Sequence, residues 1–342
     1  MGEKEGKGMT VVGGKKGLGL CVLEVLRRYS SQERPLTIKQ IEDRLRGDFG
    51  MEAGRNAVAR NLSLLRELGY PIGAGPGGKG AYLEPVFSDG ELRVLIDSVL
   101  LSRYIPSDEA RVLIEKLQGM GRPGFSDGLR GVQAVDKWNR THNRDFFERM
   151  DALTGAVAAH VQVRFLYGRV GVDGQLHDDG RVRQAHPLAL ICAQGQYYLL
   201  ACYDGAEEVR HFRVDHISGL AVTELPARTA YDLPDFRGGV DMARYAAEHR
   251  YMFSGEVMRV RLRMPVSAAG QVCDAFGRYA RMEPEAGGEY MLVQLESSLE
   301  NMRIFAMQYA GVCEVLEPAE LRDMVRQDVA RIARRYGIQC KQ

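Results

Sequence analysis

The sequence predicts a multidomain α+β protein in which helices dominate the first half and short strands the second. In the first half, apolar residues recur every three to four positions. From Val161 onward, segments in which apolar and polar residues alternate are separated by Gly and Asp turns. A chain of 342 residues is also too long for one ordinary core and suits two or three domains.

Composition excludes several classes of protein. Apolar residues make up 45% of the chain and charged residues 27%, as in ordinary globular domains. The longest apolar stretches are far shorter than the roughly 20 residues that span a bilayer, and the N-terminus lacks the apolar region of a signal peptide. We therefore expect a cytoplasmic protein that contacts no membrane. The cysteines form no C-x-x-C pair and have no histidine set at metal-ligand spacing, so neither a metal nor a cofactor is expected.

The start of the chain predicts a flexible arm followed by three helices. Residues 1–14 are rich in Gly and Lys and lack periodicity, which is typical of an arm. Apolar residues at helical spacing then indicate a first helix, at Leu18, Val22, Val25 and Leu26. Thr37 and Gln40 form a capping-box pattern that opens a second helix, which ends by Phe49–Gly50. A short turn leads to the third helix, which extends from Arg55 to Leu68.

A hairpin completes this region. Gly69 closes the third helix, and residues 70–85 then place two short apolar pieces around a tip rich in Gly and Pro. Residues 15–85 therefore predict a winged helix-turn-helix domain. Residues 1–85 carry 14 Lys and Arg against 10 Asp and Glu, whereas the rest carries 32 against 35. This concentration of positive charge is a weak indication of nucleic-acid binding.

The third helix is the predicted DNA-reading element. On a helical wheel its apolar residues form one buried stripe, at Val58, Leu62, Leu65 and Leu68. The opposite face has small polar residues and an arginine, which are the types that reach bases and phosphates from the major groove. The predicted DNA contacts are Arg55, Asn56, Ala59, Arg60 and Ser63, together with Lys79 in the wing. The alternative is an ordinary solvated helix face.

The remaining chain alternates between helical and extended segments. Residues 86–143 predict a helical linker, with Ser88 as the N-cap of a helical stretch from Phe87 to Met120. A helix over 146–160 precedes a small antiparallel β-unit, and residues 226–248 predict an irregular connection. The C-terminal part predicts strands over 258–265, 289–296 and 313–316, interleaved with helices over 267–276, 301–309 and 319–336.

Motifs in both halves of the chain carry a resemblance to a known family. Residues 196–201 have the sequence QYYLLA, and residues 210–217 have the sequence RHFRVDHI. Together with RNAVARNLSLLRELGYPI near the N-terminus, VRFLY at 163–167 and HPL at 186–188, they resemble bacterial transcriptional regulators that contain a WYL domain. Tyr197 stands where the family usually has tryptophan, and His216 stands where it has arginine.

The resemblance implies an Sm- or SH3-like β-barrel at residues 144–226 that senses a ligand, and a C-terminal extension domain at residues 227–342. In several relatives the ligand is single-stranded nucleic acid or another anion, so the implied partners are such an effector, including a nucleotide, and a double-stranded DNA operator. Arginine forks suit phosphate oxygens, and tyrosine faces suit unstacked bases. The predicted ligand contacts are Tyr167, Arg169, Arg181, Arg183, His186, Tyr198, Arg210 and Arg213.

Two properties of these residues leave alternatives open. Arg210 and Arg213 lie three apart, so a regular strand points them to opposite faces unless a bulge or twist intervenes. Several of the arginines can instead pair with carboxylates on the surface, at Asp173, Asp178, Asp179 or Asp215. Tyr197 and Phe212 are expected in the core rather than at a ligand.

We interpret the chain as a DNA-binding transcriptional regulator that acts as a homodimer. No catalytic residue is predicted, because no nucleophile motif, P-loop or H-E-x-x-H sequence occurs. Helical faces in Phe87–Met120 and Ala319–Tyr336 are candidates for the dimer interface. The alternatives are a nucleic-acid-binding accessory or dimerising scaffold protein without ligand-controlled transcription activity, and an enzyme with a hidden site.

Overall fold

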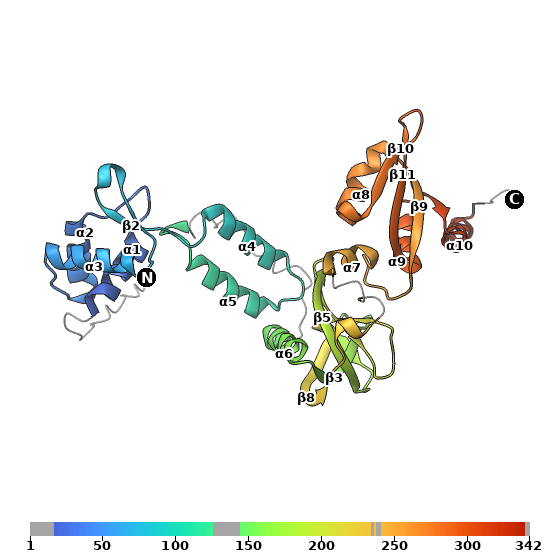
Figure 1. The fold of residues 1–342 in the computed structure, drawn as a ribbon, viewed down its shortest axis with the longest axis horizontal. Helices are drawn as coiled ribbons and strands as arrows, with labels where there is room; N and C mark the ends of the chain where they lie inside the picture. Colours follow the sequence, from blue (N-terminus) through green and yellow to red (C-terminus); the bar gives the residue numbers. More distant parts are fainter. Residues whose placement is uncertain (1–16, 126–143, 234–235, 237–240, 339–342) are drawn as a thin grey trace. The chain divides into compact units, whose positions relative to one another are not determined.

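The computed structural model describes residues 17–125, 144–233, 236 and 241–338, and Figure 1 shows their helices and strands. The chain divides into two compact units. One consists of Met1–Leu101 and Ser107–Trp138, and the other of Ser102–Pro106 and Asn139–Gln342. The predicted arm at residues 1–14 and residues 126–143 of the predicted linker lie outside the described residues.

The N-terminal part of the first unit consists of three helices and a two-stranded sheet (Figure 1). The elements are α1 (Leu18–Tyr29), α2 (Ile38–Phe49), α3 (Arg55–Glu67), β1 (Ile72–Ala74) and β2 (Ala81–Leu83). The predicted capping box is confirmed, because the Thr37 hydroxyl accepts the Gln40 amide N–H while Gln40 Oε1 accepts the Thr37 amide N–H. All four apolar positions predicted for α1 are buried, and they share one core with α2 and α3.

The apolar stripe predicted on α3 is confirmed at Val58, Leu62 and Leu65, but the prediction is wrong at Leu68. Those three residues are buried, but Leu68 lies beyond the last helical residue and is 67% exposed. Gly69 adopts a φ of +88°, which favours glycine, and turns the chain so that the Tyr70 N–H reaches the Leu65 carbonyl. The helix therefore ends before Leu68 can face the core.

The predicted hairpin is present. Its strands pair Ile72 with Leu83 and Ala74 with Ala81. Leu36, which precedes α2, adds two backbone hydrogen bonds to Ala81. The hairpin is thus attached to the helices through the backbone as well as through the core.

The helical stretch predicted from Phe87 to Met120 is divided into two helices. These are α4 (Asp89–Leu101) and α5 (Ser107–Gln118). Pro106 disfavours helical geometry at the residue before it, which explains the break. Ser88 caps α4 as predicted, because its hydroxyl accepts the Glu91 amide N–H. The Glu91 carboxylate, which was not predicted to take part, accepts the Ser88 amide N–H.

The second unit begins with a helix and a curled antiparallel sheet (Figure 1). The elements are α6 (Phe146–Ala159), β3 (Val161–Val170), β4 (Leu176–Asp178), β5 (Arg183–Ala193), β6 (Gln196–Cys202), β7 (Arg210–Arg213) and β8 (Ile217–Pro226). The strand order is β4-β3-β5-β6-β7, and β8 pairs with β3. The sheet curls because the long strand β3 pairs with β4, β5 and β8 along its length.

The connection after β8 contains a helix that the sequence analysis did not predict. Helix α7 (Met242–Glu248) begins at Asp241, whose side chain accepts the Ala243 and Arg244 amide N–H groups. Its residue Tyr245 is buried in an apolar cluster with residues of β5 and β6. A helix of seven residues is too short to be stable alone, so this packing determines that it forms.

The last part of the second unit is a four-stranded antiparallel sheet with helices. The elements are β9 (Val257–Pro265), α8 (Ala269–Phe276), β10 (Arg281–Pro284), β11 (Tyr290–Ser298), α9 (Leu299–Gln308), β12 (Glu314–Glu317) and α10 (Ala319–Arg335). Strand β10 was not predicted. The β-α-β-β-α-β order and the strand order β10-β11-β9-β12 are those of a ferredoxin-like arrangement.

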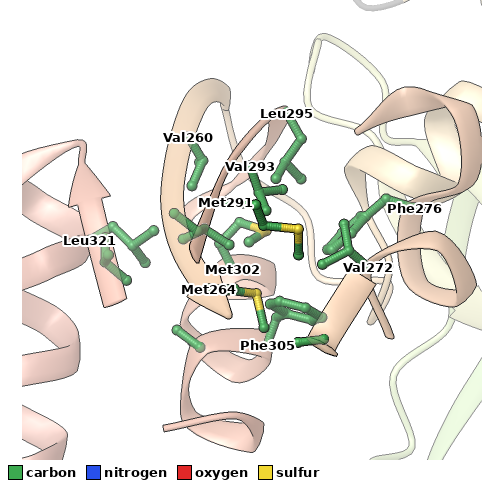
Figure 2. Close-up of a cluster of buried hydrophobic side chains, with 14 residues drawn as sticks. Val260, Met264, Val272, Phe276, Met291, Val293, Leu295, Met302, Phe305 and Leu321 are labelled. Carbon is green, nitrogen blue, oxygen red and sulfur yellow. The ribbon is translucent and has the colours of Figure 1, made fainter. Parts of the chain in front are cut away.

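The two faces of this sheet differ. Side chains of β9 and β11 pack against α8, α9 and Leu321 of α10, as Figure 2 shows. The other face carries charged and polar side chains that are exposed or half-exposed: Arg259, Arg261, Arg263, Gln294 and Glu296. Alternation along the strands therefore gives one apolar and one polar face.

Candidate functional site

Helix α3 presents a polar face to solvent. Of the predicted DNA contacts on this helix, Ala59 is half-buried and the others are exposed: Arg55, Asn56, Arg60 and Ser63. The Arg60 Nε donates to the Asn56 carbonyl over 3.3 Å, which keeps the guanidinium close to the helix. The residue before α3 is Gly54, which provides no side-chain cap, so no capping side chain occupies the amide groups of the first turn.

Contacts in the middle of α3 and near its C-terminal end fix the helix in the domain. Asn61 donates to the Ala57 carbonyl, and a Cβ atom placed on Gly19 of α1 would lie only 3.0 Å from the Asn61 amide oxygen. Near the other end, Arg66 Nε donates to the Ile72 carbonyl in β1 over 3.0 Å. Arg66 therefore links the helix to the hairpin, a role that was not predicted.

The hairpin tip holds Lys79 in an exposed position. A Cβ atom on Gly75 would lie 2.3 Å from the Lys79 carbonyl oxygen and 2.6 Å from Pro35, so only glycine fits there. Gly75 also donates its N–H to the Gly80 carbonyl. The Gly-rich tip is therefore a tight turn that positions the lysine.

The curled sheet brings some of the predicted ligand contacts together. The Arg183 guanidinium lies 5.7 Å from the centre of the Tyr167 ring, and the Arg210 guanidinium lies 5.2 Å from the centre of the Tyr203 ring. Both tyrosines meet the buried Phe212 edge-on. We call Tyr167, Arg183, Tyr203 and Arg210 the tyrosine–arginine cluster. Tyr203 was not predicted, although it directly follows the QYYLLAC strand.

Arg213 lies in different surroundings. Its guanidinium forms a bidentate ion pair with Asp215, with distances of 3.0 and 2.6 Å, and donates to Gln196. Asp215 is only 5% exposed. The Arg213 backbone N–H donates to the Tyr167 hydroxyl, whose pKa is raised by burial. No side-chain partner is shared by Arg210 and Arg213 among these contacts, in agreement with their strand alternation.

Two arginines of the cluster have carboxylate partners on the surface, as the alternative interpretation expected. Arg183 holds Asp179 through two hydrogen bonds and lowers the pKa of that carboxyl to about 2. Arg210 pairs with Glu208 over 3.0 Å, and both side chains are about half exposed. The carboxylates of both pairs, Asp179 and Glu208, are more than half exposed, unlike Asp215.

The other predicted ligand contacts are dispersed. Arg169 and Arg181 are exposed, and their guanidinium groups have no partner within the described part of the chain. Tyr198 is half-buried opposite Arg213 on the neighbouring strand. His186 is 4% exposed, and its Nδ1 accepts the Arg228 amide N–H. The role of each as a ligand contact remains a prediction.

Comparison with known families identifies two domains in the second unit. Residues 148–222 match the WYL domain, and residues 256–333 match the WCX domain. This chain contains a WYL domain followed by a WCX domain. The resemblance to WYL-domain transcriptional regulators, stated above from the residues, is confirmed.

The solved structures that are similar to the chain include three with low sequence identity to it. One is the proteasome accessory factor PafBC of Arthrobacter aurescens, with 18% identity and a TM-score of 0.29 over 94% of this chain. The chain spans 49% of the length of that protein. The others are a CRISPR Cas-related protein (10% identity, TM-score 0.38, covering 94% of this chain and 84% of the other) and a hypothetical protein (12%, 0.17, 95% and 77%).

The residue at the WYL domain's tryptophan position has a packing role. Tyr197 meets Tyr104 edge-on with ring centres 4.9 Å apart, and Phe146 lies 5.0 Å from Tyr104. Tyr104 belongs to the Ser102–Pro106 segment between α4 and α5. The WYL domain therefore holds the connection between these two helices through an aromatic contact, which the sequence analysis did not predict.

A histidine pair joins the WYL domain to α7. His211 of β7 bonds to the Tyr245 hydroxyl through Nε2 over 2.7 Å and to the Met252 carbonyl through Nδ1 over 2.8 Å. His249 lies next to it and is 3% exposed. Burial lowers the pKa of His249 to about 3, so this imidazole is neutral near pH 7.

The described residues contain no group of three or more His, Cys, Asp and Glu side chains placed to hold a metal ion. None of their helices combines the length and the apolar character needed to cross a membrane.

Proposed function

We propose that this protein is a DNA-binding transcriptional regulator whose N-terminal winged helix-turn-helix contacts an operator through α3. The observation that carries the proposal is the exposed polar face of α3, which includes Asn56 and Arg60 and lies in the same domain as the hairpin with Lys79. An arginine and an amide are the side chains that recognise guanine and adenine in the major groove. The open amide groups at the start of α3 suit a phosphate.

The hairpin gives the proposed interface a second contact. Lys79 is exposed at the tip, and the hydrogen bonds of Leu36 and Arg66 to the two strands hold the hairpin against the helices. A wing of this kind adds a phosphate contact beside the groove that the helix enters. Lys79 is therefore proposed to strengthen binding to every sequence, whereas Arg60 determines which sequence is bound.

Replacing Arg60 with alanine in the full chain tests this assignment. We expect a loss of about 1 to 3 kcal/mol in binding to an operator selected from genomic fragments, on the order of ten- to a hundredfold. Arg93→Ala is the matched control, because Arg93 is an exposed arginine on α4 paired with Asp97. Affinity within about twofold of the unchanged protein for Arg60→Ala would contradict the assignment.

The WYL domain is proposed to form an Sm- or SH3-like barrel that binds the effector, a single-stranded nucleic acid or a nucleotide. The tyrosine–arginine cluster supports this, because its guanidinium groups lie over tyrosine rings. Arg183 and Arg210 are paired with exposed carboxylates, which phosphates can displace at little cost. Arg213 is paired with buried Asp215, so it is proposed to hold the site in place rather than to contact the effector.

Titration of the full chain with short single strands tests effector binding. Arg210→Gln combined with Arg181→Gln should weaken binding and reduce its salt dependence, because both changes remove positive charge. Arg164→Gln is the control, since Arg164 is exposed on β3 but points to the side opposite Tyr167. If the single-stranded oligonucleotides bind but leave the affinity of the chain for its operator unchanged, the chain is an accessory nucleic-acid-binding protein instead.

A homodimer completes the proposal, because two copies of α3 can then contact two half-sites about one helical turn apart. Helix α10 carries exposed apolar side chains at Val329 and Ile332, and the exposed Tyr336 directly follows it, which makes this face the proposed interface. Sedimentation of the full chain gives the oligomeric state. Ile332→Asp should shift it towards the monomer, and an unchanged dimer would exclude this face.

A further inference from the structure

A cavity of about 430 Å³ lies within the first unit of the chain. Three stretches line it: the end of α1 with the turn that follows, the connection from β2 to α4, and the residues after α5. Its volume is in the range of clefts that hold small-molecule ligands, which occur preferentially where two parts of a protein meet. We call it the linker cavity.

Part of the lining of the linker cavity is apolar. Val86 and Met120 belong to it and are 74% and 46% exposed, and Leu83, Pro85 and Pro123 belong to it as well. Large apolar side chains that solvent reaches in a concave site gain free energy when a ligand covers them. The linker cavity therefore suits a ligand with an apolar body.

Both arginines of the lining already have carboxylate partners. Arg27 forms two hydrogen bonds of 2.8 Å with Glu24, which lies on the same helix but outside the lining. Arg122 pairs over 2.8 Å with Asp89, which is itself part of the lining. Because each guanidinium is balanced by a carboxylate, the charge that a ligand meets depends on the other ionisable groups of the cavity.

Those other groups are two carboxylates. Glu84 is exposed, and its carboxylate has no partner within the described part of the chain. The Glu33 carboxylate accepts the Ser31 hydroxyl over 2.8 Å, and its own backbone N–H and this hydroxyl lower the pKa of the carboxyl, with a smaller contribution from Arg122. Three carboxylates of the lining thus face Arg122 as the one guanidinium of the lining that is not held from outside it. This balance favours a cation.

We propose that the linker cavity binds a small organic amine, which is a protonated amino group attached to an apolar body. An ammonium group donates up to three hydrogen bonds, and such charged hydrogen bonds to carboxylates are among the stronger ones. Glu84 and Glu33 accept the N–H groups, and Val86 and Met120 cover the apolar body. This site lies outside the WYL and WCX domains, so it extends beyond the proposed function.

The linker cavity borders the attachment of the hairpin to α1. Ser30 is in its lining and 3% exposed, and its hydroxyl donates to the Leu26 carbonyl over 2.6 Å and accepts the Leu83 amide N–H over 3.1 Å. Leu83 is the last residue of β2, which follows the tip with Lys79. An amine at this attachment acts on the hairpin, so amine binding and DNA binding influence each other. This second step rests on the proposed function, whereas binding of the amine does not.

Titration of the full chain with matched small molecules tests the site. The probes are phenethylamine, its neutral analogue phenethyl alcohol and its anionic analogue phenylpropanoate, together with hexylamine and hexanol as an aliphatic pair. Nuclear magnetic resonance of isotope-labelled methionine methyl groups reports binding, and Met120→Leu assigns the signal of Met120. At least one amine should shift this signal to saturation and bind about tenfold or more tightly than its uncharged and anionic analogues.

Variants of the lining separate the charge from the apolar wall. Glu84→Gln removes a charged acceptor and should weaken amine binding about tenfold, with little effect on the alcohol. The fold should be unaffected, because the exposed Glu84 carboxylate has no partner within the described residues. Val86→Ser should weaken binding of the amine and the alcohol alike. Glu115→Gln is the matched control, since Glu115 is an exposed glutamate on α5 outside the lining, and it should bind the amine within about twofold of the unchanged chain.

Three results would overturn the inference. One is that neither amine shifts the Met120 signal. Another is that the alcohols or phenylpropanoate bind as tightly as the amines, because the carboxylates of the lining then do not select a cation. The third is that Glu84→Gln binds the amines as tightly as Glu115→Gln does.

The link to DNA is measured separately. A saturating amine should change the affinity of the unchanged chain for its operator by about fivefold or more, and should have no effect on Glu84→Gln at the same concentration. If the amine binds but operator affinity stays the same, the amine site is supported and its link to the hairpin is excluded. If Arg60→Ala fails to weaken operator binding, the proposed function fails, while the amine site is judged by the titrations without DNA.

Discussion

The WYL and WCX domains both contain antiparallel sheets with arginines, but the surroundings of these arginines differ. In the WYL domain, Arg213 is paired with a carboxylate that is 5% exposed. In the WCX domain, Arg259 and Arg281 lie on a polar, solvent-facing side of the sheet. A guanidinium beside a buried carboxylate stabilises the fold, whereas one on an open face is available to a ligand. Burial of the partner, rather than residue type, separates the two roles.

The largest expected effect concerns the covered face of the WCX sheet. Phe305 is 1% exposed, and its ring centre lies 4.9 Å from those of Phe276 and Tyr309. Phe305→Ala should reduce the free energy of unfolding by about 4 kcal/mol, measured by urea unfolding followed by circular dichroism. Arg261→Ala on the polar face of the same sheet is the control and should cost under about 1 kcal/mol. If both variants lost a similar free energy of unfolding, the two faces of the sheet would not differ in their contribution to stability.

The next effect tests the buried ion pair of the WYL domain. Arg213→Met leaves the Asp215 carboxylate without its bidentate partner and should cost about 3 kcal/mol of unfolding free energy. Arg213→Met/Asp215→Leu should recover part of this loss, because no charge is then left buried. Arg281→Met in the WCX domain removes an exposed pair and should cost about 0.5 kcal/mol or less. If Arg213→Met lost as little unfolding free energy as Arg281→Met, the proposed difference between the buried and the exposed ion pair would be contradicted.

The histidines between the two domains predict a pH dependence. The pKa of His249 is about 3 in the folded chain against 6.5 as its ordinary value, so the unfolded chain binds the proton more readily. Stability is therefore full above about pH 6.5 and decreases as the pH falls towards 3, by up to about 2 kcal/mol at pH 5. Thermal unfolding from pH 7 to 5 measures this slope. His249→Phe should reduce the dependence of stability on pH. If the variant shows the same dependence as the unchanged chain, other titratable groups cause the effect.

The smallest effect concerns the aromatic contact of the WYL domain with the Ser102–Pro106 segment. Tyr104→Ala removes two ring contacts and should weaken the segment's attachment by about 1 kcal/mol. Hydrogen exchange of the amides in this segment should then become about fivefold faster. Tyr231→Ala, at a residue that is 69% exposed, is the control and should leave exchange unchanged. Unaltered exchange in Tyr104→Ala would show that the contact does not hold the segment.

Local sequence signals predicted the helices well where the deciding contacts lie within one turn. The capping pairs Thr37–Gln40 and Ser88–Glu91 are three residues apart, and both form the hydrogen bonds that their spacing predicts. Helix α7 was missed because its stability comes from distant partners, whereas strand β10 is short and pairs with the strand that follows it. Tyr245 is buried against the WYL sheet, and β10 is a four-residue strand that pairs with β11.

The same division between local and distant contacts applies to the candidate site. Alternation along β7 correctly separated Arg210 from Arg213, because it depends only on local strand geometry. It did not select Asp215 from the four nearby carboxylates as the buried partner of Arg213. The contacts of Tyr104 with Tyr197 and of Arg66 with Ile72 also lay beyond sequence reasoning, since they depend on how separate elements pack.

By itself the sequence determined the order of most helices and strands, the caps of α2 and α4, the polar face of α3 and the resemblance to WYL-domain regulators, because each depends on residues close together in the chain. Only the tertiary structure decided that Leu68 is exposed, that Arg213 is held by a buried carboxylate, and that Tyr104 meets Tyr197. Periodicity gives the side of an element on which a residue lies. Which groups contact that residue depends on packing between segments far apart in the chain.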